Sequence, residues 1–134
     1  MAYKHAAIWI DHQRARVVLF NREDSHNVKL ESHAEQHIHH KHGSVGSGHA
    51  PEDRHFFEAI TQATAGVDEV LVCGPAQAKL AYVKHVEAHQ PALRSHILGV
   101  IDSDHPSDGQ LLAEARKWFA AADRMRPGGG IRLP

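Results

Sequence analysis

Histidine and glycine gather in one stretch of this sequence, residues 33–55, with the order HAEQHIHHKHGSVGSGHAPEDRH. Seven of the fourteen histidines and three of the ten glycines lie there, and no run within it is apolar enough for a strand or a helix face. We therefore expect residues 33–50 to form a polar loop that the rest of the chain presents. Its groups suit two kinds of chemistry, metal binding by imidazole and RNA contact through cations and glycine backbone.

Metal binding would fall to four histidines within six residues: His37, His39, His40 and His42. Neutral imidazole is a good ligand for zinc, nickel and copper, and donors so close in sequence form a chelate with little loss of chain entropy. No HExxH or Cys-His finger spacing accompanies them. We therefore expect no obligatory cofactor and keep a divalent metal as an alternative.

Carboxylates at the expected strand ends offer a second kind of site. Asp11 follows the first apolar run, and Asp102 and Asp104 follow the last one, so the three could hold magnesium for hydrolysis. Each aspartate also fits ordinary turn chemistry. Cys73 has no acidic or imidazole neighbour in sequence, and Gly74 suits a tight strand-to-helix connection. Turn and core roles are therefore favoured over catalysis at these positions.

Composition limits the classes of protein that fit. A chain of 134 residues with 42% hydrophobic residues supports one globular domain, and a net charge of -1 means that any nucleic-acid contact must come from a local patch. One cysteine excludes an intramolecular disulfide and a cysteine-rich zinc site. No apolar run is long enough for a signal peptide or a membrane span. We expect a cytoplasmic protein with no membrane partner.

Apolar periodicity predicts five strands, over residues 5–10, 15–20, 28–33, 68–73 and 96–101. It predicts three helices, from Pro51 to Gly66, over 76–89, and after a Ser107 cap. The apolar helix faces expected are Phe56, Ile60, Ala63 and Val67 in the first helix, Leu80, Val83 and Val86 in the second, and Leu111, Leu112, Ala115, Trp118, Phe119 and Ala122 in the third. Trp9 and Trp118 should lie in the core, and the cations Lys79, Lys84, Arg116 and Lys117 should be solvated.

This order of elements predicts an α/β fold. A three-stranded antiparallel meander followed by βαβ units gives a mixed five-stranded sheet with helices packed on it, because the later strands need right-handed crossovers onto a parallel sheet. That is the order of the ribonuclease H-like layered fold. We expect residues 1–126 to form a single domain that carries the loop 33–50, and residues 127–134, rich in glycine and proline, to be a disordered tail.

Three stretches resemble the middle domain of the eukaryotic and archaeal class-1 peptide chain release factors and of Pelota: HKHGSVGSGHAPEDRHFF, VLVCGPAQAKLAYVKHV and ILGVIDSDHPSDGQLLAEA. The resemblance covers most of the chain, residues 4–125, and is greatest to the bacterial stand-alone family usually called translational machinery proteins. It implies the same ribonuclease H-like fold. It also implies partners in translation, namely the ribosome, through rRNA or a tRNA.

In the release factors this loop carries a Gly-Gly-Gln tip that enters the peptidyl transferase centre and helps to place the hydrolytic water. Residues 46–49, Gly-Ser-Gly-His, take the place of that tip in this chain, and the glutamine is absent. Pelota also lacks the glutamine and binds stalled ribosomes without hydrolysing the ester. The resemblance therefore implies binding rather than catalysis, and His49 is the one candidate for a catalytic side chain.

The resemblance and the chemistry of the loop together suggest a set of RNA-binding residues: Lys41, His42, Gly43, Ser44, Gly46, Ser47, Gly48, His49 and Arg54. Lys41 and Arg54 would contact phosphates, the glycines would let the backbone approach closely, and the histidines would stack on bases or hydrogen-bond with them.

Our leading hypothesis is a ribosome-associated accessory protein of translation whose histidine- and glycine-rich loop contacts rRNA or the tRNA acceptor end. One alternative is a hydrolase of peptidyl-tRNA or RNA. Another is a binding protein that responds to metal or pH through its histidines, since unperturbed imidazole titrates near pH 6.5.

Overall fold

The computed structural model describes residues 3–32 and 51–125. Within them the elements are β1 (His5–Ile10), β2 (Arg14–Phe20), β3 (Ser25–Glu31), α2 (Pro51–Ala63), β4 (Glu69–Gly74), α3 (Ala78–His89), α4 (Pro91–Arg94), β5 (Ile97–Asp102) and α5 (Asp108–Met125). The expected loop 33–50 and the expected tail 127–134 lie outside the described residues.

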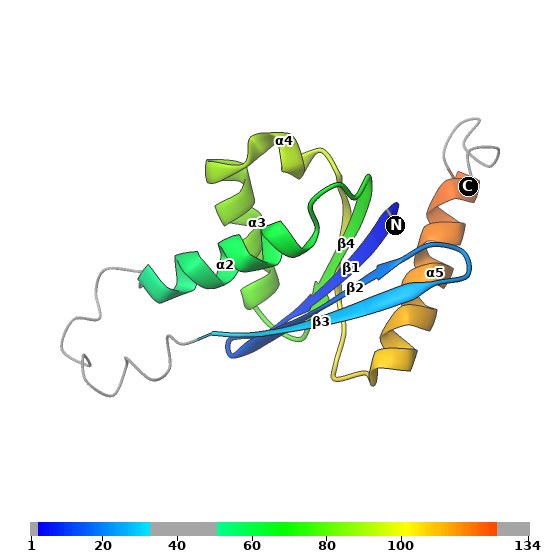
Figure 1. Cartoon of the computed structure of the whole chain (residues 1–134), viewed down its shortest axis with the longest axis horizontal. Coiled ribbons are helices and arrows are strands. Elements are labelled where there is room, and N and C mark those ends of the chain that lie inside the picture. Colours follow the sequence, from blue (N-terminus) through cyan, green and yellow to red (C-terminus); the bar gives the residue numbers. More distant parts are fainter. Residues whose placement is uncertain (1–2, 33–50, 126–134) are drawn as a thin grey trace.

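The five strands form one mixed sheet in the order β3-β2-β1-β4-β5. The pairs β1–β2 and β2–β3 are antiparallel, whereas β1–β4 and β4–β5 are parallel. Helices cover both faces of the sheet (Figure 1). The predicted α/β fold, with a meander followed by βαβ units in the ribonuclease H-like arrangement, is therefore confirmed.

β1 lies at the centre of the sheet, and all six of its residues are buried. Its side chains alternate between two core clusters, so that Ala6, Ile8 and Ile10 face one layer of helices while Ala7 and Trp9 face the other. A strand with paired neighbours on both edges and helices on both faces leaves no room for a solvated side chain. This explains why the run from Ala6 to Ile10 has no charged residue.

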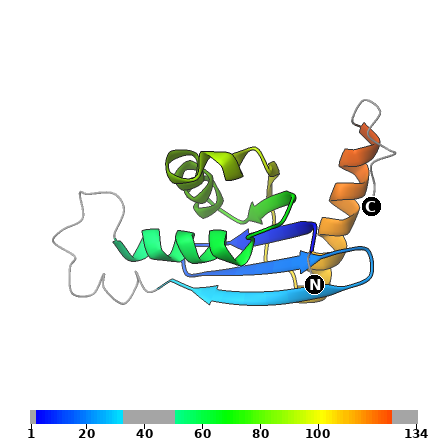
Figure 2. The same ribbon diagram turned by 45° about the horizontal axis from the view of Figure 1, so that its top comes forward.

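The first helical layer consists of α2, α3 and the short α4, and the second of α5 alone (Figure 2). Phe56, Phe57 and Ile60 of α2 join Tyr82 and Val86 of α3 in the first core cluster. α5 contributes its own buried row to the second cluster, from Leu111, Ala115 and Phe119. The expected core face of α5 is thus confirmed at these three positions, and Trp9 is fully buried as predicted.

β3 begins earlier than predicted, at Ser25 rather than Val28, and it ends at Glu31 rather than His33. The preceding turn is short, because the N–H of Asn21 donates to the carbonyl oxygen of Asp24 at 3.0 Å. Residues 25–27 then pair with β2 through their backbone while remaining exposed. The apolar periodicity of the sequence does not predict residues 25–27 as strand, because backbone pairing at an exposed edge strand needs no apolar side chains.

The predicted face of α3 was wrong at Leu80, and so was the expectation that Lys79 is solvated. Leu80 is 47% exposed, whereas Lys79 is only 7% exposed. Lys79 can be buried because its Nζ lies 2.9 Å from Oδ1 of Asp102 and also donates to the carbonyl oxygen of Ala76. The helix begins at Ala78, two residues later than predicted, and Pro91 starts the unpredicted α4 instead of only ending α3.

The predicted Ser107 cap is confirmed. The N–H of Gln110 donates to Oγ of Ser107 at 3.1 Å, and the N–H of Ser107 donates to Oε1 of Gln110 at 2.9 Å. Arg116 is not a free surface cation as expected, because its Nη2 donates to the carbonyl oxygen of Asn21 at 2.9 Å. Its guanidinium also lies over the ring of Phe20, so α5 holds the β2–β3 turn.

Two glycine substitutions should have opposite effects on stability. In Gly74→Ala the new Cβ would collide with the carbonyl oxygen of Ile10, so the substitution should lower the free energy of unfolding by more than about 1 kcal/mol. In Gly109→Ala the Cβ would enter open space within α5 and should stabilise the protein by about 0.5 kcal/mol. Urea unfolding of both variants checks this; equal stabilities would contradict the close approach at Gly74.

Candidate functional site

The residues predicted to bind RNA or metal fall almost entirely between positions 37 and 49, outside the described residues. This applies to His37, His39, His40, His42 and His49 and to the lysine, serine and glycine positions among them. Arg54 is described, and its side chain is exposed in the first turns of α2. The structure therefore tests the surroundings of the predicted site rather than the site itself.

The segment 33–50 is joined to the fold at one edge of the sheet. β3 runs in the same direction as β1, so it ends at the edge where the parallel strands also end, and α2 begins beside it (Figure 1). The N–H of Ser32 donates to the carbonyl oxygen of Gln13 at 2.8 Å, which ties the end of β3 to the β1–β2 turn. We call this the carboxyl edge, defined by residues 11–14, 31–32, 74–77 and 102–108 and the start of α2. In open α/β sheets, this kind of edge commonly carries the functional groups.

The three aspartates proposed for magnesium all lie at the carboxyl edge but are used separately. Oδ1 of Asp11 accepts the N–H groups of Gln13 and Arg14, both at 2.8 Å. Asp102 pairs with Lys79. Among the side chains that the structure describes, in residues 3–32 and 54–125, no three of His, Cys, Asp or Glu are placed so that they could hold one metal ion. The turn role of Asp11 is thus confirmed.

His105 lies between the carboxylates of Asp104 and Asp11. Its Nδ1 is 3.1 Å from Oδ1 of Asp104, and its Nε2 is 3.8 Å from Oδ2 of Asp11. The imidazole also packs against the ring of Trp9, with 5.1 Å between centroids. Asp104 itself is almost fully exposed, with 97% of its side-chain surface accessible. His105 is therefore a surface residue of a turn, in line with the prediction from sequence.

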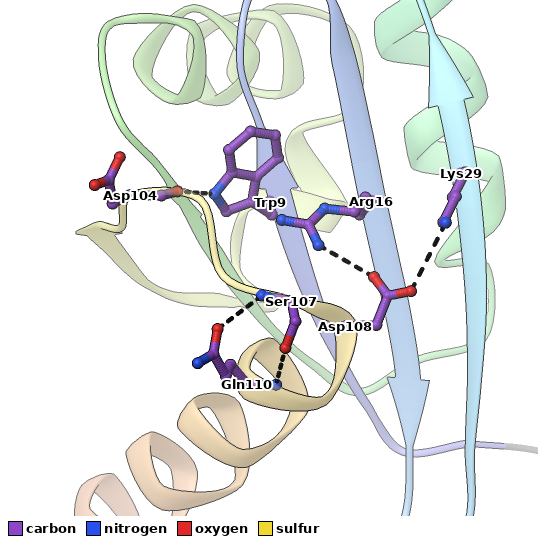
Figure 3. A network of polar contacts seen from close by, with 7 residues as sticks. All are labelled: Trp9, Arg16, Lys29, Asp104, Ser107, Asp108 and Gln110. Carbon is purple, nitrogen blue, oxygen red and sulfur yellow. Dashed lines mark hydrogen bonds and ion pairs between the residues drawn. The ribbon is translucent and has the colours of Figure 1, made fainter.

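A polar network fixes the start of α5 on the sheet (Figure 3). Nε1 of the buried Trp9 donates to the carbonyl oxygen of Asp104 at 2.7 Å, and the guanidinium of Arg16 lies 4.8 Å from the Trp9 ring. Nη1 of Arg16 donates to Oδ1 of Asp108 at 3.1 Å, and Nζ of Lys29 is 3.8 Å from Oδ2. Neighbouring cations of β2 and β3 thus converge on one carboxylate, which neutralises part of their charge.

Cys73 is a buried core residue, as predicted. Burial raises the pKa of its thiol to about 12, and the negative charge of Glu114 adds to this rise. A thiol with such a pKa is protonated near neutral pH and is a poor nucleophile. The adjoining Gly74 lies directly over the carbonyl of Ile10, so the predicted tight strand-to-helix connection is also confirmed.

Sequence reasoning missed the roles of Arg16, Lys29 and Lys79. A signal was present for Arg16, since it is the one charged residue inside the apolar run ARVVLF. Its partner Asp108 is 92 positions away, so the pairing depends on the strand order and on which face α5 covers.

No helix within the described residues is long and apolar enough to cross a lipid bilayer.

The fold resembles known proteins, although no protein-family model and no curated protein sequence matches the chain. Pelota from Archaeoglobus fulgidus aligns with a TM-score of 0.60 and 9% identity over 87% of this chain and 32% of its own length. The archaeal translation termination factor aRF1 aligns with a TM-score of 0.55 and 17% identity over 90% of this chain and 38% of its own length. Dom34 from S. cerevisiae aligns with a TM-score of 0.58 and 12% identity over 89% of this chain and 34% of its own length.

These solved structures include the class of protein inferred from the sequence, so the resemblance to release factors and Pelota is confirmed at the level of fold. The chain spans about a third of the length of each of these proteins. Dom34 is described as a translation termination-like factor involved in RNA quality control pathways that interacts with Hbs1. Fold similarity at such low identity does not by itself transfer an activity.

The Arg16–Asp108 pair should stabilise the attachment of α5. Asp108 is 38% exposed, so we expect a coupling free energy of about 0.5–1 kcal/mol from a double-mutant cycle of Arg16→Met and Asp108→Asn. The more exposed pair of Arg94 and Glu87, also 3.1 Å apart, is the matched control and should couple more weakly. Screening by 1 M salt should reduce both values. A coupling no larger than that of the control would contradict the proposed role.

Ionisation of Cys73 should destabilise the protein only at alkaline pH. In the unfolded chain a thiol ionises near pH 8.5, whereas in the folded protein its pKa is about 12. The stabilising contribution is therefore complete below about pH 8.5 and is lost as pH rises towards 12, with a slope of up to about 1.4 kcal/mol per pH unit. Chemical unfolding from pH 8 to 11 should show a shallower decline for Cys73→Ala. Rapid thiol labelling of the native protein at pH 8 would contradict the burial.

Proposed function

We propose that this chain acts in translation as an accessory ribosome-binding protein, and that the segment 33–50 with Arg54 contacts rRNA or the tRNA acceptor end. It would do so as a counterpart of the release-factor middle domain. The proposal places the protein where ribosomes are, in the cytoplasm. It requires no cofactor.

The fold supports this proposal. Proteins with the same arrangement include a translation termination factor and a termination-like factor, and each aligns over most of this chain. The separate resemblance of residues 40–57 to the release-factor loop concerns the part of the sequence that joins β3 to α2. The observation that carries the proposal is this attachment, since β3 and α2 anchor both ends of the segment at the carboxyl edge.

The described part of the carboxyl edge offers exposed arginines for contact with phosphate groups, beside one exposed carboxylate, that of Asp104. Asp11 accepts two backbone N–H groups, and Asp102 and Asp108 are paired with cations. The side chains of Arg14 and Arg54 are exposed at or beside this edge. Phosphate contacts need local cations of this kind because the chain as a whole has no excess of positive charge.

Co-sedimentation with ribosomes tests the proposal. The double variant Lys41→Glu, His49→Ala should make one phosphate contact and one base contact fewer, so it should stay near the top of the gradient while the parent protein sediments with ribosomes. Arg54→Glu should weaken binding as well. Removal of a single phosphate contact should decrease the slope of log K against log salt by about 1.

Arg22→Glu is the matched control. It makes the same charge change at an exposed arginine of the β2–β3 turn, at the opposite edge of the sheet, and should sediment like the parent protein. If the double variant and the parent associate with ribosomes equally, the proposed contact is wrong. If the control fails to bind too, net charge rather than the segment determines association.

The same samples decide between binding and hydrolysis. Release of labelled peptide from peptidyl-tRNA on the ribosome should stay at the background level for the parent protein, with or without chelator, since the tip glutamine is absent. Release that depends on His49 would favour the hydrolase.

A further inference from the structure

A cavity between α2 and α3 lies outside the carboxyl edge, and no proposal above uses it. Its volume is about 130 Å³, which is several times the space of one water molecule. Its lining decides which chemical group it suits, and consists of Glu58, Thr61, Gln62, His85, His89 and Gln90.

Contacts beside the cavity hold the two helices together. Oγ1 of Thr61 and the hydroxyl group of the fully buried Tyr82 share a hydrogen bond of 2.9 Å. The ring of Phe57 packs against those of Tyr82 and His85, with 5.6 and 5.3 Å between centroids. The polar groups of the cavity are therefore presented by helices whose spacing is already set by packing.

α2 contributes a carboxylate and an amide to the cavity. Glu58 and Gln62 are four residues apart, so they lie one turn apart on the same face of the helix. A carboxylate carries a negative charge near neutral pH, and an amide oxygen accepts hydrogen bonds. This side of the cavity therefore suits a ligand that is positively charged and rich in donors.

The end of α3 adds to the negative character of the cavity. His89 is the last residue of the helix and Gln90 is its C-cap, and both line the cavity. The N–H of Gln90 donates to the carbonyl oxygen of Val86 at 2.7 Å, and Pro91 starts the next helix, so α3 ends here. The C-terminal end of a helix carries a partial negative charge, which favours a cation.

An exposed aromatic ring distinguishes between the possible cations. The ring of His89 is at an exposed position, and its centroid lies 4.6 Å from that of His85. A guanidinium group is planar, stacks on aromatic faces and offers five N–H donors to a carboxylate and to amide oxygens at the same time. An ammonium group is a compact, strongly hydrated point charge. The lining therefore suits guanidinium better than ammonium.

We propose that this cavity binds a guanidinium group, with the carboxylate of Glu58 as its counter-ion and the ring of His89 as its stacking surface. The amide oxygens of Gln62 and Gln90 accept further N–H donors of the group. His85 contributes packing through its ring, and its nitrogen atoms take no part in binding. Free arginine and the arginine side chain of a partner protein carry the same group, and the experiment separates these two sources.

The test is an NMR titration of the full-length chain without an affinity tag. The probes are L-arginine, N-acetylarginine amide, which represents a side chain within a protein, and N-acetyllysine amide. The arginine compounds should shift the backbone amide signals of residues 58–62 and 85–90, and the lysine compound should bind several-fold more weakly. Tighter binding of L-arginine indicates a small-molecule ligand, whereas tighter or equal binding of the blocked amide indicates an arginine side chain.

Glu58→Gln removes the charge at an exposed position and keeps the size of the side chain. It should weaken the binding of N-acetylarginine amide by about 10-fold, because a charge-assisted hydrogen bond is lost, and it should leave the melting temperature without ligand unchanged. His89→Ala should weaken binding several-fold, since the stacking surface is removed. The matched control Glu23→Gln makes the same charge change in the exposed β2–β3 turn and should bind like the parent protein.

Amide signals of residues 58–62 and 85–90 that do not move with either arginine compound would overturn the proposal. So would equal affinities of Glu58→Gln and the parent protein, or equal affinities for the arginine and lysine compounds. Guanosine monophosphate is added in a further titration, and tighter binding of this nucleotide than of the arginine compounds would assign the cavity to a base instead. None of these results depends on ribosome binding.

Discussion

Burial of β1 on both faces and both edges is the constraint on which the rest of the structure depends. The strand pairs antiparallel with β2 and parallel with β4, and its side chains belong to both core clusters. One polar side chain, that of His5, is accommodated because its Nε2 lies 3.2 Å from Oε1 of Glu69, between the rings of Phe20 and Phe119. This central position makes β1 a shared member of the core cluster under α2 and α3 and of the cluster under α5.

The same burial determines the carboxyl edge. Trp9 brings an indole N–H into the interior, and an unsatisfied donor there would cost about 1–3 kcal/mol. The carbonyl of Asp104 accepts it, so the connection from β5 to α5 is held against β1. Arg16 covers the indole ring and reaches Asp108 in the first turn of α5, where a negative charge suits the helix dipole. Packing of one aromatic residue thus positions a helix and two charges.

The sequence was sufficient to predict those elements that have a local signal in their own residues. β1 and the Ser107 cap were predicted closely because apolar runs and capping residues are local signals. The start of β3 and the buried side of α3 were not predicted, since they depend on partners distant in sequence. Residues 25–27 pair with β2, and Lys79 is buried because it pairs with Asp102. The same holds for the site. The residue types of the proposed RNA-binding segment are visible in the sequence, whereas the convergence of Arg16, Lys29 and Asp108 at the start of α5 depends on the strand order.

The carboxyl edge differs from a hydrolytic centre in how its carboxylates are used. A magnesium-dependent site needs several carboxylate oxygens directed at one point. Here Asp11, Asp102 and Asp108 are divided among a backbone turn, Lys79 and the cations of β2 and β3, and the exposed Asp104 contacts His105. Among the described residues these carboxylates therefore hold the β1–β2 turn, α3 and the start of α5 in place. The proposed function at this edge therefore depends on the segment between β3 and α2, which joins the fold here.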